Sequence, residues 1–88
     1  MYDVLVSRTF QKQFGLLQRD MQKRIRSALK RLGENPFEPR SGLDIKPLVN
    51  TNPPKYRLRI GDHRIIYLIE GNIVKIIEVF RRGRGYRE

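Results

Sequence analysis

Three short segments rich in β-branched and aromatic residues follow one another in the second half of the chain, each separated from the next by only two residues. They span residues 56–60, 63–69 and 73–80, with Gly61-Asp62 and Gly71-Asn72 between them. A two-residue connection that contains glycine favours a tight β-hairpin turn, because glycine tolerates the positive φ that such turns require. The sequence therefore predicts a three-stranded antiparallel meander, and no other feature limits the possible folds as strongly.

The first third of the chain predicts a strand followed by two helices. Residues 2–7 are rich in β-formers, and Ser7 is a suitable N-cap for a helix. Apolar residues then recur at helical spacing, with a break at residues 18–20 and a helix end expected at Gly33. These apolar positions are Phe10, Phe14, Leu17, Met21, Ile25, Ala28, Leu29 and Leu32. The opposite face of the second helix is basic, which is typical of a solvated surface. It carries Lys23, Arg24, Arg26, Lys30 and Arg31.

A long connection between residues 36 and 54 holds all five prolines. Connections of this length in a small domain are often functional. Arg40 and Lys46 are candidate ligand contacts within it, although ordinary surface charges are at least as good an interpretation. We expect its apolar residues to anchor it to the core, and these are Leu43, Ile45, Leu48 and Val49.

Together these segments predict one α+β domain over residues 1–88, in which a small twisted sheet packs on two helices. The length suits a single domain with one core. No apolar run approaches the ~18 residues that a membrane-spanning helix needs. Residues 1–7 are too short for a signal peptide and run directly into polar sequence. We therefore expect a cytoplasmic protein that does not interact with membranes.

The chain has no cysteine and one histidine, His63. Disulfides, thiolate metal sites and thiol nucleophiles are therefore excluded, and so is a histidine-rich metal site. Any catalysis must use arginine, lysine, tyrosine, carboxylate or hydroxyl groups, and we expect no metal and no cofactor. His63 follows a predicted turn on the core side, so we interpret it as structural.

The net charge is +10, and the positive excess is shared equally between residues 1–53 and 54–88. An excess of this size in a small domain favours polyanionic partners and steers their approach. Solubility or heat adaptation would give a similar composition. The position of the charges must therefore distinguish these interpretations.

The predicted hairpin turn sets which residues share a face of the sheet. It pairs Arg59 with Arg64 and places Arg57 on the same face, while the apolar residues of the other face form a bed for the helices. Two directly opposed arginines repel each other, and neither strand holds an acidic residue to offset them. Phosphate is the simplest missing partner, because guanidinium groups bind it bidentately. A solvated polar face is the alternative.

Two further features flank this arginine face. Simple alternation adds an apolar strip to it, which suits an amphipathic segment of a partner or the chain's own loop. The strip comprises Ile66, Leu68, Ile77 and Val79. Residues 81–87 add phosphate ligands and an aromatic ring that can stack on an unpaired base. They include Arg81, Arg82, Arg84, Tyr86 and Arg87.

The stretch from Tyr56 to Tyr86 resembles the RelE/ParE toxin superfamily. The residues that carry the resemblance are Tyr56-Arg57-Leu58-Arg59-Ile60-Gly61-Asp62-His63-Arg64-Ile65-Ile66-Tyr67, Glu78-Val79-Phe80-Arg81-Arg82 and Tyr86. The order of the earlier elements fits as well, so the resemblance covers essentially the whole chain. It implies the RelE-like fold and a type II toxin that an acidic, RelB-like antitoxin neutralises by wrapping around it.

Resemblance to the RelE branch, bacterial or archaeal, implies an mRNA interferase. Such a toxin is a ribosome-dependent endoribonuclease that inhibits translation by cutting messenger RNA in the decoding site. The ribose 2′-hydroxyl attacks the adjacent phosphodiester, and no metal is required.

The resemblance also implies roles for individual residues. Arg57, Arg59 and Arg64 match phosphate and transition-state ligands. Arg82 matches the arginine that ends the last strand, and Tyr86 matches a tyrosine that stacks on a base and assists proton transfer. We expect Arg40, Lys46, Arg81 and Arg84 to contact RNA.

Two departures from the family pattern bear on the chemistry. Lysine commonly stands where this chain has Arg57 and Arg59, and arginine cannot readily act as a base. Many relatives have Gly-His where this chain has Phe80-Arg81, so a histidine acid or base is absent there. Simple alternation also puts Arg81 on the arginine face, whereas the resemblance favours Arg82, and a bulge would exchange the two.

Two other functions compete with RNA cleavage. A ParE-like toxin would inhibit DNA gyrase and cleave nothing. A non-catalytic RNA-binding or ribosome-binding module would need no antitoxin. The combination of Arg82 and Tyr86 favours cleavage, because it has a role in RNA chemistry and no evident role in binding gyrase.

Overall fold

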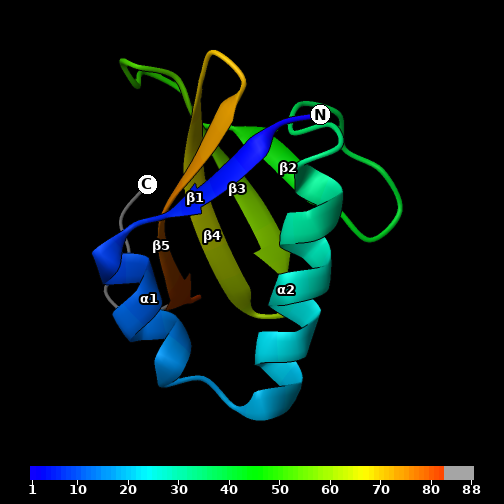
Figure 1. Ribbon diagram of the computed structural model, residues 1–88, viewed down its shortest axis with the longest axis vertical. Coiled ribbons are helices and arrows are strands. Elements are labelled where there is room, and N and C mark those ends of the chain that lie inside the picture. Colours follow the sequence, from blue (N-terminus) through cyan, green and yellow to red (C-terminus); the bar gives the residue numbers. More distant parts are fainter. Residues whose placement is uncertain (83–88) are drawn as a thin grey trace.

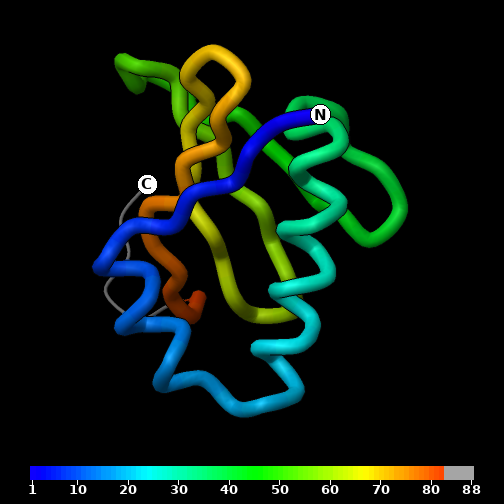
Figure 2. The backbone as a smooth tube through the Cα atoms, in the orientation of Figure 1, coloured from blue at the N-terminus to red at the C-terminus, as the bar shows by residue number. Residues whose placement is uncertain are grey.

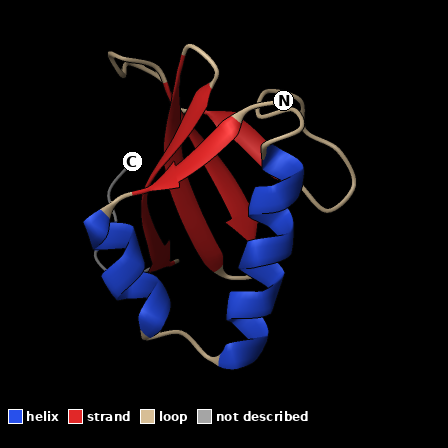
Figure 3. Ribbon diagram, viewed as in Figure 1, coloured by secondary structure: helices blue, strands red, loops and turns tan. Residues whose placement is uncertain are grey.

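The computed structural model describes residues 1–82, and within them two helices cover one face of a five-stranded sheet (Figures 1 and 3). The strands are β1 (Asp3–Val6), β2 (Asp44–Pro47), β3 (Lys55–Ile60), β4 (His63–Glu70) and β5 (Ile73–Arg81). The helices are α1 (Arg8–Gly15) and α2 (Arg19–Leu32). The strand order is β1-β5-β4-β3-β2, with β1 parallel to β5 and all other neighbours antiparallel. The predicted α+β class is confirmed, and no described helix is long and apolar enough to cross a membrane.

Both predicted hairpin turns are present. Gly61 and Gly71 each have a φ of 59°, which is the left-handed region that a glycine adopts without strain. The first turn pairs Ile60 with His63 and Arg59 with Arg64, as the sequence predicts. It lies at the same end of the sheet as the end of β5 and the connection between the helices (Figure 2).

The fold contains a strand that the sequence analysis treats as loop. β2 pairs antiparallel with β3, and Asp44 stands opposite Arg59. Alternation along β2 buries Ile45 and exposes the residues on either side of it. The buried Leu43 and Ile45 confirm two of the four expected anchors, and Leu48 is half-buried. Val49 is wrong as an anchor, because 84% of it is exposed in the loop beyond β2.

A β-bulge interrupts the pairing of β4 with β5. Ile66 pairs with Glu78 and Tyr67 pairs with Ile76, so one extra residue of β5 lies between them. Beyond the bulge, simple alternation fails, because the extra residue exchanges the two faces. Val79 therefore lies in the core and not in the predicted apolar strip, and Glu78 takes its place on the arginine face.

The helices are fixed to the sheet by both caps and core contacts. The side chain of Ser7 accepts a hydrogen bond from Phe10 N at the start of α1, which confirms the predicted N-cap. Gly33 ends α2 as expected. Apolar residues of both helices pack with the inner face of the sheet. They are Phe10, Ile25, Ala28 and Leu32, against Leu58, Ile60, Ile65, Tyr67, Val74, Ile76 and Val79.

Tyr67 carries a polar group into this core. Its side chain is fully buried, and its hydroxyl donates a hydrogen bond of 2.8 Å to the carbonyl of Pro36. Burial, with Tyr56 beside it, raises the pKa of Tyr67, so the hydroxyl remains protonated as a donor. The bond ties the connection after α2 to the middle of the sheet.

Tyr67→Phe is expected to lower the free energy of unfolding by about 1–3 kcal/mol, because the Pro36 carbonyl loses its partner in a buried place. Urea denaturation of the two proteins measures this difference. Tyr56→Phe is the matched control: the Tyr56 ring stacks on Tyr67, but its hydroxyl has no hydrogen bond within residues 1–82. Equal losses in both variants would mean that the Pro36 contact contributes nothing specific.

Candidate functional site

The face of the sheet opposite the helices carries a basic groove. Its volume is about 610 Å³, and it lies between β2, β3, β4 and β5 and the connection after β2. We call it the basic groove. The charged residues that line it are Lys46, Lys55, Arg57, Arg64 and Glu78, and Ile66 lies at its centre. Two of the predicted catalytic arginines and one predicted RNA contact, Lys46, thus lie together.

Arg57 is the most enclosed cation of the groove. Only 9% of it is exposed, and its Nη2 lies 3.3 Å from Oδ1 of Asp44. The carboxylate that offsets Arg57 comes from outside the two hairpin segments, because the unpredicted strand β2 brings Asp44 beside β3. The ion pair with Asp44 fixes the guanidinium, and Arg57 Nε is buried without a hydrogen-bond partner within residues 1–82.

The sequence analysis did not place two of the groove residues on the arginine face. Glu78 faces the groove because of the bulge, which has no evident signal in the sequence. Lys55 faces it because β3 begins one residue earlier than predicted, so Lys55 alternates with Arg57. Extending the predicted strand by one residue would have found Lys55. The groove thus holds four cations and one carboxylate that can accept a proton.

Arg59 does not line this groove, although it pairs with Arg64 across the hairpin. It is exposed at the end of β3 and lines a different pocket, next to α2. Arg40 lines that same pocket. Its guanidinium donates to the carbonyls of Asn35, Glu38 and Arg31, so it holds the connection after α2 in place.

Arg81 lies on the helix side of the sheet. The bulge pairs it with His63, and its Nε is 2.9 Å from Oδ2 of Asp62 in the hairpin turn. The other oxygen of Asp62 is 3.0 Å from Nδ1 of His63, which agrees with a structural role for this histidine. Desolvation acts to raise the pKa of Asp62, but the hydrogen bond and positive charge of Arg81 outweigh it and hold that pKa below its ordinary value.

Arg82 is exposed directly after β5, where its backbone N–H donates to the carbonyl of Asp62 at 2.7 Å. The sequence analysis left open that a bulge moves Arg81 away from the arginine face, and the structure shows this move. Arg84 and Tyr86 lie outside the described residues.

The predicted apolar strip exists in altered form. Ile66 is buried in the floor of the basic groove, and Leu68 is half-buried beside it. Simple alternation would put Phe80 on the core face, but the bulge places it on the arginine face, opposite Arg64. Leu5 of β1 pairs with Lys75, the neighbour of Leu68, and extends the strip with 54% of its surface exposed.

Comparisons with known proteins agree on one family. The family model described as ParE toxin of type II toxin-antitoxin system, parDE, matches residues 4–86. No curated protein sequence matches the chain.

Solved structures of toxins share the fold. The RelE of an archaeal RelE–RelB complex from Pyrococcus horikoshii OT3 is 29% identical, with a TM-score of 0.81, over 96% of this chain and 98% of that one. A RelB–RelE antitoxin–toxin complex from Methanococcus jannaschii is 25% identical, with a TM-score of 0.72, over 88% of each chain. The isolated E. coli RelE toxin is 16% identical, with a TM-score of 0.76, over 97% of this chain and 88% of that one, and this likeness concerns the fold alone.

Proposed function

Because this chain belongs to the RelE/ParE family, as a toxin of a type II toxin–antitoxin system, we propose that it is a RelE-type endoribonuclease. It cleaves messenger RNA on the ribosome, in the cytoplasm, and thereby inhibits translation. The observation that carries this proposal is the basic groove, in which Arg57 and Arg64 share a wall with Lys46, Lys55 and Glu78.

The proposed reaction is transfer of a phosphoryl group within the RNA. The 2′-oxygen of a ribose bonds to the adjacent phosphorus, the bond from phosphorus to the 5′-oxygen of the next nucleotide breaks, and a 2′,3′-cyclic phosphate and a free 5′-hydroxyl result. The 2′-hydroxyl loses a proton and the leaving oxygen gains one. The chain's own residues can supply this chemistry, since charge stabilisation and proton transfer need no cofactor.

The proposal assigns a task to each cation of the groove and to two residues beyond it. Arg64 binds the non-bridging oxygens of the scissile phosphate and stabilises the negative charge that develops on them in the transition state. Arg57, held by Asp44, orients the same phosphate. Arg82 is a further phosphate ligand beside the end of β5, and Tyr86 accepts the proton. Lys46 and Lys55 hold the RNA backbone on either side.

The ribosome supplies the rest of the site by positioning the message. Fixing two reacting atoms in a productive geometry contributes several kcal/mol to rate acceleration. A groove that is open to solvent and flanked by lysines suits an extended single strand presented by a larger particle.

A ParE-like inhibitor of DNA gyrase is the second candidate, and the description of the matching family favours it. Primer extension on a message in translating ribosomes, after addition of the purified toxin, distinguishes the two. We expect discrete cuts within codons and unchanged supercoiling by gyrase. Inhibited supercoiling without cuts would assign the ParE-like function, and binding to ribosomes without either effect would leave a non-catalytic module.

The proposed partner is an acidic antitoxin of the RelB kind, since the similar P. horikoshii toxin is solved as a RelE–RelB complex. The net charge of +10 and the apolar strip at Leu5, Leu68 and Phe80 suit an acidic amphipathic segment on the arginine face.

Arg57, Arg59 and Arg64 are therefore expected to become protected when the antitoxin binds, and replacing all three by alanine should weaken binding by at least about tenfold, since each charge pair at an interface contributes upwards of 1 kcal/mol. Isothermal titration with the co-expressed antitoxin measures this. Undiminished affinity of the triple variant would place the antitoxin on another face.

A further inference from the structure

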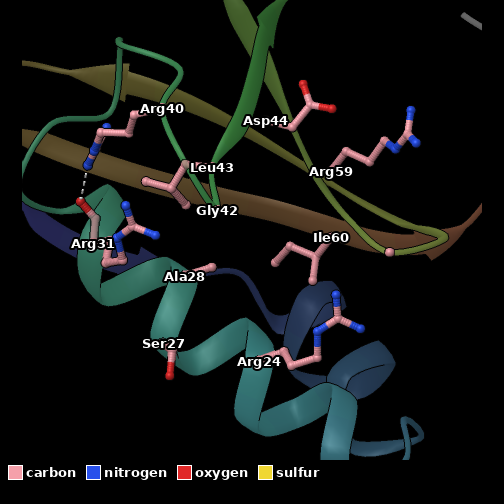
Figure 4. Close-up of a pocket in the computed structure, with 11 residues that line it drawn as sticks. Arg24, Ser27, Ala28, Arg31, Arg40, Gly42, Leu43, Asp44, Arg59 and Ile60 are labelled. Atoms are coloured by element: carbon pink, nitrogen blue, oxygen red, sulfur yellow. Dashed lines mark hydrogen bonds between the residues drawn. The ribbon is translucent and has the colours of Figure 1, made fainter.

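A second basic pocket lies on the helix side of the molecule, where α2 meets the end of β3 and the connection before β2 (Figure 4). We call it the α2 pocket. Its volume is about 510 Å³, and its charged lining residues are Arg24, Arg31, Arg40, Asp44 and Arg59. The sequence analysis interpreted the two helix arginines among them as part of a solvated face.

Two of these arginines form the wall of the α2 pocket, and their guanidinium groups already donate hydrogen bonds to backbone carbonyls. Arg40 donates to three backbone carbonyls, one of them that of Arg31, as the dashed line in Figure 4 marks. Arg31 donates to the carbonyl of Ser41 at 2.7 Å. Its guanidinium lies against Gly42, whose φ of 81° and missing side chain make room for it. These contacts set the position of the connection relative to α2.

The other two arginines are available for a ligand. Neither Arg24 nor Arg59 has a hydrogen bond or ion pair within residues 1–82, and both are exposed. Arg24 lies over the hairpin turn, with Nη1 3.3 Å from where a Cβ on Gly61 would be. The carboxylate that lines the pocket, Asp44, is paired with Arg57. The α2 pocket therefore has an excess of positive charge that the described residues do not offset.

Arg59 connects the α2 pocket with the basic groove. It stands two residues after Arg57 on β3, a separation of about 7 Å along a strand, and Arg57 lines the groove while Arg59 lines the pocket. Cations thus continue from the groove around the end of β2 to α2. An extended polyanion that occupies the groove can reach the pocket without leaving the surface.

We propose that the α2 pocket binds backbone phosphates of the RNA outside the cleaved bond, with Arg24 and Arg59 as ligands; this inference rests on the proposed RNA substrate. An acidic protein segment would present similar charge, but a peptide gains affinity from apolar anchors. The apolar floor offers little of this, because Ala28, Leu43 and Ile60 are only 6%, 1% and 7% exposed. The pocket provides positive charge and hydrogen-bond donors, and a phosphodiester needs no apolar anchor beyond these.

The test measures binding and not cleavage. The probe is a fluorescent single-stranded RNA with 2′-O-methyl groups, which lacks the attacking hydroxyl, and anisotropy gives its affinity at several salt concentrations. Loss of one phosphate contact reduces the salt slope by about 0.7, which corresponds to roughly fivefold weaker binding at 0.1 M salt. We expect both changes in Arg24→Gln.

Two further variants complete the design. Ser27→Glu adds a negative charge at a pocket-lining position that holds no positive ligand, and it should weaken binding by a similar factor. Arg19→Gln is the matched control, since it removes the same charge from the exposed start of the same helix, outside the α2 pocket and the basic groove.

Each outcome is informative. Equal affinity and salt slope in Arg24→Gln and Arg19→Gln would overturn the inference, as would weaker binding of the antitoxin without weaker binding of the RNA. A wild-type protein that binds the probe through Arg24 but never cuts messages would overturn the proposed cleavage and leave the α2 pocket intact.

Discussion

Arg64→Ala is expected to lower the rate of message cleavage by about 100-fold or more, because loss of one charge ligand of the transition state typically has this effect. Arg64 is half-buried in the basic groove and enters it from β4, opposite Phe80 of β5, while Glu78 stands opposite Ile66. Single-turnover cleavage on programmed ribosomes, quantified by primer extension, measures the change.

Two variants make this result specific. Arg64→Lys should recover only part of the rate, since an ammonium group cannot reproduce the bidentate fork of a guanidinium. Arg19→Ala removes an exposed arginine far from the groove and should leave the rate unchanged. A loss in Arg19→Ala equal to that in Arg64→Ala would mean that overall charge, and not the groove, governs activity.

Tyr86→Phe is expected to lose about 100-fold or more of the cleavage rate while retaining ribosome binding, because general-base catalysis typically contributes that much. The substitution keeps the ring, which can stack on a base, and removes the hydroxyl. Positive charge lowers the pKa of a nearby phenol, and four arginines stand within residues 81–87. Tyr86→Ala removes the ring as well and should weaken both cleavage and binding.

Glu78→Gln is the necessary comparison, since Glu78 is the carboxylate that lines the groove. If Tyr86 is the base, this variant should cleave at nearly the normal rate and bind RNA more tightly, because a negative charge beside the phosphate is gone. Full activity of Tyr86→Phe together with an inactive Glu78→Gln would transfer the role of base to Glu78.

The sequence predicts most reliably what local geometry controls. Two-residue turns at Gly61 and Gly71 set the register of the meander, so the opposition of Arg59 and Arg64 follows from the sequence alone. Periodicity likewise predicts both helices and their buried faces. The core residues Ile25, Leu32 and Leu58 follow from these patterns.

The remaining features depend on contacts between distant segments. β2 is short and proline-containing, and it becomes a strand only by pairing with β3, so its Asp44 and the ion pair with Arg57 cannot be predicted locally. The bulge in β5 exchanges the faces of Glu78 and Val79 because it inserts one residue without a partner in β4, and no local pattern in the sequence marks it. The α2 pocket needs Gly42 and Arg31 to meet across a connection.

The place of β5 in the sheet has a consequence for when the protein can become active. Of the five strands, β5 is made last, yet it lies between β1 and β4, and Ser7 and Gln13 both bond to it across more than sixty residues of chain. Pairings of such long sequence separation form late in folding. A nascent chain that ends at β4 therefore lacks the strand that pairs with β1 and that bonds to Gln13 of α1, and it lacks the wall that carries Glu78. Synthesis order thus delays assembly of the groove until the last strand has left the ribosome that makes it.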